Sequence, residues 1–361
     1  MANNNENKIL NVPNLRFPEF SGEWVTKSIN DLAVVIGGGT PDTTVKSYWD
    51  GEIQWFTPSE IGKNKYVDSS LRTITEVGLN NSSAKLLPPN TILLSSRATI
   101  GECSLSLREC ATNQGFQCLV SKKCNVDFLY YLIQTKKKDL IRKSCGSTFL
   151  EISANEVRKI QVSVPSDVEQ QKIAELLSLI DERIATQNKI IDKLKSLIKG
   201  LPHKMAEIGL QKGCWEKVLL STVLVERKEL NSELYTVHSV SVSEGVINQI
   251  EYLGRSFAAK DTSNYHVARY GDIIYTKSPT GDFPYGIVKQ SYIEQPVAIS
   301  PLYGVYSPTS FETGVYLHYY FMSSVLAKNY LYPLIQKGAK NTINISNQRF
   351  LENRIALPLK Q

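Results

Sequence analysis

Residues 167–199 read DVEQQKIAELLSLIDERIATQNKIIDKLKSLIK and contain a regular apolar repeat. Apolar residues recur alternately every four and every three positions, which is the heptad spacing of a coiled-coil seam. The seam consists of Ile173, Leu177, Ile180, Ile184, Gln187, Ile191, Leu194 and Ile198, and Gln187 is its one polar member. We therefore predict a long α-helix whose seam packs against a partner helix. The alternative is a long core helix inside one globular domain.

The residues on either side of this stretch carry signals for a helix start and a helix end. Pro165 and Ser166 precede Asp167, and acidic or amide side chains occupy the first turn, as in a capped helix start. Gly200 and Pro202 follow the repeat and predict its end. A helix of about 33 residues extends about 50 Å. We assign residues 166–204 to this spacer helix.

Composition describes an ordinary globular protein that is large enough for two domains. The chain has 361 residues, 42% of them hydrophobic, and a net charge of +6, which permits a polyanionic partner without requiring one. No apolar run approaches the roughly 20 residues of a membrane helix. The polar start lacks a signal peptide, and the six cysteines form no close pair. We expect a cytoplasmic protein with reduced thiols and no membrane partner.

Similar segments occur in the same order on both sides of the helix. Each pair lies about 190 residues apart, which indicates an internal duplication. The matched segments are 22–24 and 213–215, 90–97 and 271–278, 111–119 and 298–306, 150–157 and 343–350, and 162–165 and 355–358. We therefore predict two similar α/β (α+β) domains, residues 1–165 and 205–361. The second copy ends at 358–361, so we expect a second long helix to be absent from this chain.

The sequence contains no recognisable catalytic motif. The four histidines are scattered, without the spacing of a zinc site or a hydrolase triad. The run Gly37-Gly38-Gly39 lacks the second half of a dinucleotide fingerprint, and we interpret it as a turn. Asp282-Phe283-Pro284-Tyr285 differs at its second position from the tetrapeptide of amino-methyltransferases. We expect a non-catalytic chain with no catalytic residue, metal or cofactor of its own.

The segment that runs from Pro165 into Glu169-Gln170-Gln171-Lys172-Ile173-Ala174, together with the duplication, resembles the specificity (S) subunit of type I restriction–modification systems. The resemblance covers nearly the whole chain, including Gly37-Gly38-Gly39-Thr40-Pro41. It implies two target recognition domains, at opposite ends of two antiparallel conserved helices, that each read one half of a bipartite double-stranded DNA target. It further implies that the helices dock methylase (M) subunits, and that a restriction (R) subunit joins the complex in DNA methylation and phage defence. S-adenosylmethionine and ATP are expected on those partner subunits.

The missing second conserved helix departs from this family pattern. It leaves open a truncated or silent specificity chain that needs a helix in trans, from another polypeptide or by self-association. Two readings from other classes also remain. They are a stand-alone DNA methyltransferase, against which the lack of motifs argues, and a coiled-coil adaptor with no role on DNA.

Polar and basic loop residues are the candidates for DNA contact, because Lys and Arg suit phosphate or guanine and Asn and Gln can pair with adenine. In the first domain we predict contacts from Thr40, Lys63, Asn64, Lys65, Ser96, Arg97, Asn113 and Gln114. In the second we predict contacts from Lys277, Ser278, Thr280, Tyr285, Lys337, Lys340 and Asn341. For each residue taken singly, a solvated loop side chain is the competing interpretation.

Overall fold

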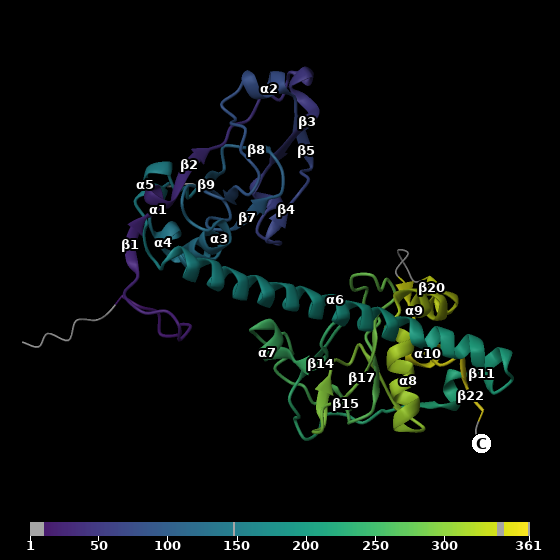
Figure 1. The fold of residues 1–361 in the computed structure, drawn as a ribbon. Coiled ribbons are helices and arrows are strands. Elements are labelled where there is room, and N and C mark those ends of the chain that lie inside the picture. Colours follow the sequence, from purple (N-terminus) through teal and green to yellow (C-terminus); the bar gives the residue numbers. More distant parts are fainter. Residues whose placement is uncertain (1–10, 147–148, 338–342, 360–361) are drawn as a thin grey trace, which may run out of the picture. The chain divides into compact units, whose positions relative to one another are not determined.

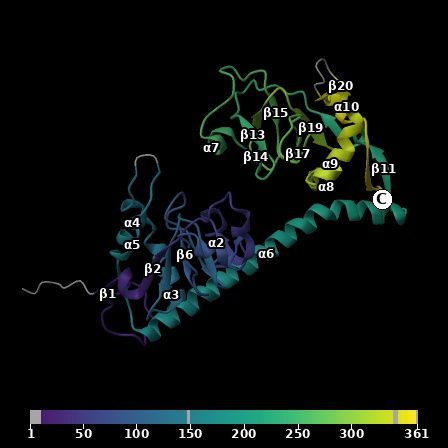
Figure 2. The ribbon, with the colours of Figure 1, turned by 90° about the horizontal axis from the view of Figure 1, so that it is seen from above.

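The computed structural model of this chain describes residues 11–146, 149–337 and 343–359. The chain divides into two compact units, the first unit Met1–Thr186 and the second unit Gln187–Gln361. One helix, α6 (Asp167–Gln211), begins in the first unit and ends in the second (Figures 1 and 2). The fold is therefore the predicted one: two α/β units connected by a long helix.

The helix α6 begins on polar residues that are buried in the first unit. The Glu169 carboxylate accepts from Arg16 Nε and Nη2, at 2.7 Å each, and from Trp24 Nε1 at 3.3 Å. The Gln170 side chain accepts from the Asn125 backbone N–H at 3.0 Å and donates to the Pro165 carbonyl at 3.0 Å. Both side chains are almost fully buried. The Glu-Gln pair of the sequence motif therefore fixes the first turn of α6 to the first unit.

The predicted end of the helix at Gly200 and Pro202 is wrong, because α6 continues to Gln211 with Pro202 inside it. Pro202, Ala206 and Gly209 are buried and share one face of the helix. A Cβ at Gly209 would lie 2.2 Å from the Trp215 ring, so the helix packs closely on that ring. This tertiary packing outweighs the cost of the missing proline N–H.

The middle of α6 is exposed, which excludes the alternative of a core helix. Every residue from Leu179 to Leu201 is exposed within the described chain. Ile180 and Ile184 of the seam have 45% and 53% of their surface accessible, whereas Ile173 packs against the core of the first unit. The partner of the seam stays a prediction.

The first unit is built on a five-stranded sheet of order β2-β9-β6-β7-β4. Its core packs around Ile92, Leu119, Leu129 and Ile133, which are fully buried. The strands of this sheet are β2 (Ala33–Gly37), β4 (Tyr66–Val67), β6 (Ile92–Leu94), β7 (Cys103–Ser106) and β9 (Gln117–Ser121). A three-stranded sheet contains β3 (Trp49–Phe56), β5 (Arg72–Ile74) and β8 (Cys110–Thr112), and β1 (Val25–Ser28) pairs with β10 (Gln161–Val164). The helices are α1 (Ile29–Leu32), α2 (Glu76–Asn80), α3 (Val126–Thr135), α4 (Lys137–Arg142) and α5 (Ala154–Arg158), with 3-10 turns η1 (Lys46–Tyr48) and η2 (Pro58–Glu60).

The second unit contains a four-stranded sheet of order β12-β19-β16-β17. Ile273, Tyr306, Leu317 and Phe350 are fully buried in its core. The strands of this sheet are β12 (Leu224–Glu226), β16 (Ile273–Tyr275), β17 (Val288–Gln290) and β19 (Gly304–Pro308). The paired strands are β11 (Trp215–Leu219) with β22 (Arg354–Pro358), β13 (His238–Ser241) with β14 (Gly245–Asn248), β15 (His266–Ala268) with β18 (Val297–Ile299), and β20 (Gln336–Lys337) with β21 (Ile343–Asn344). The helices are α7 (Gln249–Leu253), α8 (Phe311–Phe321), α9 (Ser324–Leu331) and α10 (Asn347–Phe350), with 3-10 turns η3 (Leu220–Thr222) and η4 (Tyr332–Leu334).

The two units repeat one topology, which confirms the predicted duplication. The strand order β2-β9-β6-β7 of the first unit corresponds to β12-β19-β16-β17 of the second. The central hairpins have the same antiparallel register, with Ile92 opposite Leu105 and Ile273 opposite Gln290. In both units the last strand pairs with the first strand. β10 pairs with β1 in the first unit, and β22 pairs with β11 in the second.

Two segments of the first unit each contain a pair of short elements. Ser153 caps α5 by accepting from the Glu156 N–H, and β10 follows α5. Lys136 separates α3 from α4.

Candidate nucleic-acid interface

Three of the predicted contact residues meet where two loops of the first unit lie side by side. The Gly39 N–H donates to the Thr112 carbonyl at 2.8 Å, and the Thr40 hydroxyl donates to Gln114 Oε1. A Cβ at Gly38 would lie 2.0 Å from the Asn113 carbonyl oxygen, so this close approach requires glycine. Gly37 therefore ends β2, and Gly38 and Gly39 form an irregular connection in place of the predicted turn. This connection brings Thr40, Asn113 and Gln114 together.

Within this group, Gln114 has a free hydrogen-bonding group at the surface. Its side chain is exposed, and its Oε1 is occupied by Thr40, which leaves the amide NH₂ available to donate. Asn113 is less available, because its Oδ1 accepts from the Gly115 N–H at 2.9 Å. Bidentate pairing of Gln114 with adenine would require the Thr40 hydroxyl to turn away.

Lys63 and Asn64 are exposed on a loop that is fixed by its backbone. The buried Ser104 hydroxyl accepts from the Gly62 N–H at 2.9 Å and donates to the Asn64 carbonyl at 2.7 Å. The backbone is therefore anchored while both side chains point to solvent. Lys63 is placed where a cation can contact a phosphate.

Lys65 does not fit its predicted role, because its ammonium group is used inside the first unit. It forms an ion pair with Asp127 Oδ1 at 2.7 Å and donates to Ser178 Oγ of α6 at 2.7 Å and to Tyr131 OH at 3.2 Å. Only 10% of its side chain is exposed. Burial alone would lower the pKa of Lys65, but the bonds to Asp127 and Tyr131 outweigh burial and raise the pKa. Lys65 therefore attaches the body of the first unit to α6.

Ser96 and Arg97 are also less available than predicted. Ser96 is fully buried, and its hydroxyl has no partner among the described residues, so we remove it from the candidates. Arg97 Nε lies 2.9 Å from Glu151 Oε1, and 42% of the Arg97 side chain is exposed. The ends of its guanidinium can reach a ligand while the Nε pair is kept.

Arg72 is a candidate that the sequence did not indicate. Its guanidinium carbon lies 3.5 Å from the centroid of the Trp49 ring, and the side chain is exposed. Stacking on an indole holds the group flat and leaves its donors facing solvent. Within the described chain Arg72 forms no ion pair. A local pattern could not find it, because Trp49 and Arg72 are distant in sequence.

Four of the seven predicted contacts of the second unit lie on the loop between β16 and β17. Lys277 has a positive φ of 61° and is half-buried, and burial lowers its pKa while Glu226 opposes the shift. Ser278 and Thr280 are exposed, and the Thr280 N–H donates to the Phe283 carbonyl at 3.0 Å in a tight turn. Tyr285 packs against the core, with its ring centroid 6.2 Å from that of Tyr332.

Three further predicted residues of the second unit lie near its end in the sequence. Lys337 lies at the end of the short strand β20. Lys340 and Asn341 lie outside the described residues.

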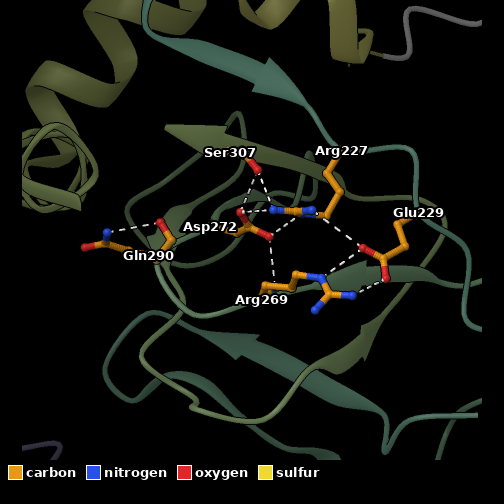
Figure 3. A network of polar contacts seen from close by, with 7 residues as sticks. Arg227, Glu229, Arg269, Asp272, Gln290 and Ser307 are labelled. Atoms are coloured by element: carbon orange, nitrogen blue, oxygen red, sulfur yellow. Dashed lines mark hydrogen bonds and ion pairs between the residues drawn. The ribbon is translucent and has the colours of Figure 1, made fainter. Parts of the chain in front are cut away.

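An ion-pair network centred on the buried Asp272 joins strands at the end of the β16–β17 hairpin opposite that loop (Figure 3). Asp272 accepts from Arg227 Nε at 2.6 Å, from Ser307 Oγ at 2.9 Å and from the Arg269 N–H at 2.8 Å. Arg269 forms a bidentate pair with Glu229. The hydrogen bond to Glu229 raises the pKa of Arg269. Arg227 is neutralised by the buried Asp272 and holds strands together, so it is not a candidate for DNA contact.

The described residues hold no group of His, Cys, Asp and Glu side chains that could bind a metal ion. All six cysteines are free, and burial raises the pKa of Cys103, Cys110, Cys118 and Cys124 to about 12. Such thiols stay protonated and unreactive near neutral pH. No helix in the described parts of the chain is long and apolar enough to span a membrane.

Comparison with known proteins finds proteins that are similar to this chain in sequence and in fold. The family model for the type I restriction modification DNA specificity domain matches residues 21–196. The MjaIX type I restriction enzyme specificity subunit of Methanocaldococcus jannaschii is 39% identical over 180 residues, which cover 48% of this chain and 42% of that protein. The EcoR124I/EcoR124II specificity subunit of Escherichia coli is 31% identical over 199 residues, which cover 53% of this chain and 46% of that protein. The chain thus spans less than half the length of these curated relatives.

Solved structures extend the likeness to both units. The crystal structure of a type I restriction–modification S subunit from M. genitalium has a TM-score of 0.53 at 15% identity and covers 93% of this chain and 85% of its own. A structure from work on complex assembly and conformational transition of the type I R-M system has a TM-score of 0.52 at 13% identity, with 96% and 87% covered. At such identities the likeness shows a shared fold.

Proposed function

We propose that this chain, whose residues 21–196 match the family model of the type I restriction modification DNA specificity domain, selects the DNA sequence for a type I restriction–modification complex. One observation carries the proposal. The two units share one strand order and register, while the loops between their equivalent strands differ in length and side chains. A repeated scaffold with different loops is suited to read two different half-sites of one duplex.

Each unit would read its half-site through the loops described above. In the first unit, Gln114, Asn113 and Thr40 supply groups for base edges, and Lys63 and Arg72 supply cations for phosphates. In the second unit, Lys277, Ser278 and Thr280 take these roles. Because its ligand is cellular or invading DNA, we expect the protein in the cytoplasm.

The catalytic work would fall to partner subunits. Methylase subunits would bring S-adenosylmethionine, and a restriction subunit would bring ATP.

The exposed seam of α6 would provide the helix–helix contact of the complex. Ile180 and Ile184 expose about half of their surface, which is costly for isoleucine unless another helix covers them. The covering helix would come from another polypeptide or from a second copy of the chain.

Filter binding of the full chain to duplex DNA, with and without methylase subunits, tests this proposal. The proposal predicts binding that prefers some sequences over others when the methylase is present, with a strong dependence on salt. If no sequence is preferred in either condition, the proposal fails. Methylation by the purified chain alone would favour a stand-alone methyltransferase instead.

A further inference from the structure

A pocket in the second unit borders the β16–β17 loop through Asp282 and Phe283, but Lys277, Ser278 and Thr280 do not line it. It has a volume of about 630 Å³ and opens between the C-terminal half of α6, strand β17 and helices α8 and α9. Its lining includes Lys195 and Lys199 of α6, Lys289 of β17, His318 of α8 and Ser323 before α9. Among the described lining residues, Asp282 is the one carboxylate. The pocket is therefore positively charged.

Lys289 is the most informative of these residues. Only 5% of its surface is exposed. Within the described chain its ammonium group forms no ion pair or hydrogen bond. Burial lowers its pKa, and the nearby Lys199 lowers the pKa further. A buried, unpaired ammonium beside a second cation is unfavourable unless an anion joins them.

The first unit shows that the scaffold itself does not require a lysine at this position. Lys289 pairs with Ile274 across the β16–β17 hairpin, and Ser104 pairs with Leu93 at the same place in the β6–β7 hairpin. The Ser104 hydroxyl is satisfied by two backbone hydrogen bonds. The charge in the second unit is thus a feature of that unit and has no role in the common fold.

Two neutral donor groups face the same pocket. His318 Nδ1 accepts from the Gln290 N–H at 3.0 Å, so its proton resides on Nε2. Burial and the nearby Lys289 lower the pKa of His318 to about 4, so the ring is neutral near pH 7. Helix α9 begins beside it, with Ser323 as its cap accepting from the Leu326 N–H at 3.4 Å. The first turn of a helix carries unpaired N–H groups and a partial positive charge.

We propose that this pocket binds a phosphate group, held by Lys289, Lys199 and Lys195 with donors from His318 and the start of α9. The phosphate would belong either to the backbone of a DNA duplex or to a small free phosphate compound. A tetrahedral dianion or a phosphodiester offers acceptors to several donors at once and neutralises the clustered cations. The inference does not rest on sequence reading by the loops.

Titration of the full chain with inorganic phosphate and pyrophosphate, followed by calorimetry and by thermal unfolding, tests the site. We expect saturable binding and a rise in Tm. The double variant Lys195→Ala/Lys199→Ala should weaken binding at least about tenfold, as expected for lost charged hydrogen bonds. Lys193→Ala is the matched control, because this α6 lysine is exposed but does not line the pocket. It should bind as the wild type does.

Lys289→Met provides an independent variant that keeps the length of the side chain. It should abolish the rise in Tm with phosphate, while the variant without ligand unfolds at the same or a higher temperature. Absence of saturable phosphate binding by the wild type would overturn the proposal. Equal weakening in Lys193→Ala would also overturn it, because the effect would then reflect general surface charge.

Competition with a short duplex identifies the source of the phosphate. If duplex DNA displaces inorganic phosphate from the wild type, and the Lys195→Ala/Lys199→Ala variant binds the duplex more weakly, the pocket holds the DNA backbone. If the duplex and phosphate bind independently, the pocket serves a small phosphate compound. Both outcomes are independent of the proposed function, because neither requires the chain to prefer one DNA sequence over another.

Discussion

Lys63 and Lys65 show how two identical side chains, two positions apart, take different roles. Lys63 is exposed, whereas Lys65 is enclosed by Asp127, Tyr131 and Ser178. The sequence cannot separate them, because the partners of Lys65 lie more than 60 residues away. The same reason explains why the sequence could not show that Ser96 is buried or that Arg72 stacks on Trp49. Residue types in loops were predictable, but their burial was not.

Replacing Lys65 by Met should destabilise the first unit by about 1–3 kcal/mol, because Asp127 would lose its partner while staying partly solvated. Urea unfolding of the full chain measures the change. Lys63→Met is the matched control and should change stability by less than about 0.5 kcal/mol. Equal effects of the two substitutions would show that Lys65 does not anchor α6.

Gln114→Ala and Lys63→Ala should separate base reading from phosphate contact. Loss of the Gln114 amide should reduce discrimination at one base pair by about 1–3 kcal/mol. Loss of Lys63 should weaken binding to all sequences alike and reduce the salt slope by about 0.9. Competition binding at several salt concentrations measures both quantities. A uniform loss for Gln114→Ala would contradict its proposed role.

His318 should make the stability of the second unit depend on pH. Its folded pKa, about 4, lies below the ordinary value of 6.5, so the unfolded chain binds more protons between these values. The stability contributed by neutral His318 is therefore complete above pH 6.5 and is lost as pH falls toward 4. Denaturation midpoints from pH 4 to 7.5 should fall less steeply for His318→Gln than for the wild type. Parallel curves would refute this assignment.

At the scale of elements, α6 was predictable in its start and its seam but not in its end. The heptad repeat and the Glu-Gln motif are local patterns, and the structure confirms the helix that they indicate. Pro202 is normally a stop signal, but its face, with Ala206 and Gly209, packs on Trp215. That contact involves a strand that follows the helix. No helix propensity could reveal it.

Replacing Ile180 and Ile184 by Lys should abolish assembly with methylase subunits or with a second copy. Both side chains are about half exposed, so the chain itself should stay folded. Co-purification with methylase subunits and sedimentation of the chain alone measure assembly, and circular dichroism checks folding. Glu182→Lys/Ala185→Lys is the matched control on the other side of α6. Assembly that survives in the seam variant would refute the seam as the contact surface.

At the scale of the whole molecule, the duplication was visible in the sequence and has a physical basis. Buried strands such as β6 and β16 must keep their apolar pattern and register to form a core, so their similarity persists. The loops between them face solvent and vary freely in length. The fold could therefore be predicted, while the details of the recognition surface could not.

Selection of bound sequences from random duplexes, with the full chain and its methylase subunits, tests most directly that each unit reads one half-site. We predict two short fixed blocks separated by a gap of unspecified bases. Gln114→Ala should change one block and leave the other intact. Lys277→Gly, which tolerates the positive φ, should change only the second block. A single continuous block, or one altered by both substitutions, would contradict the account.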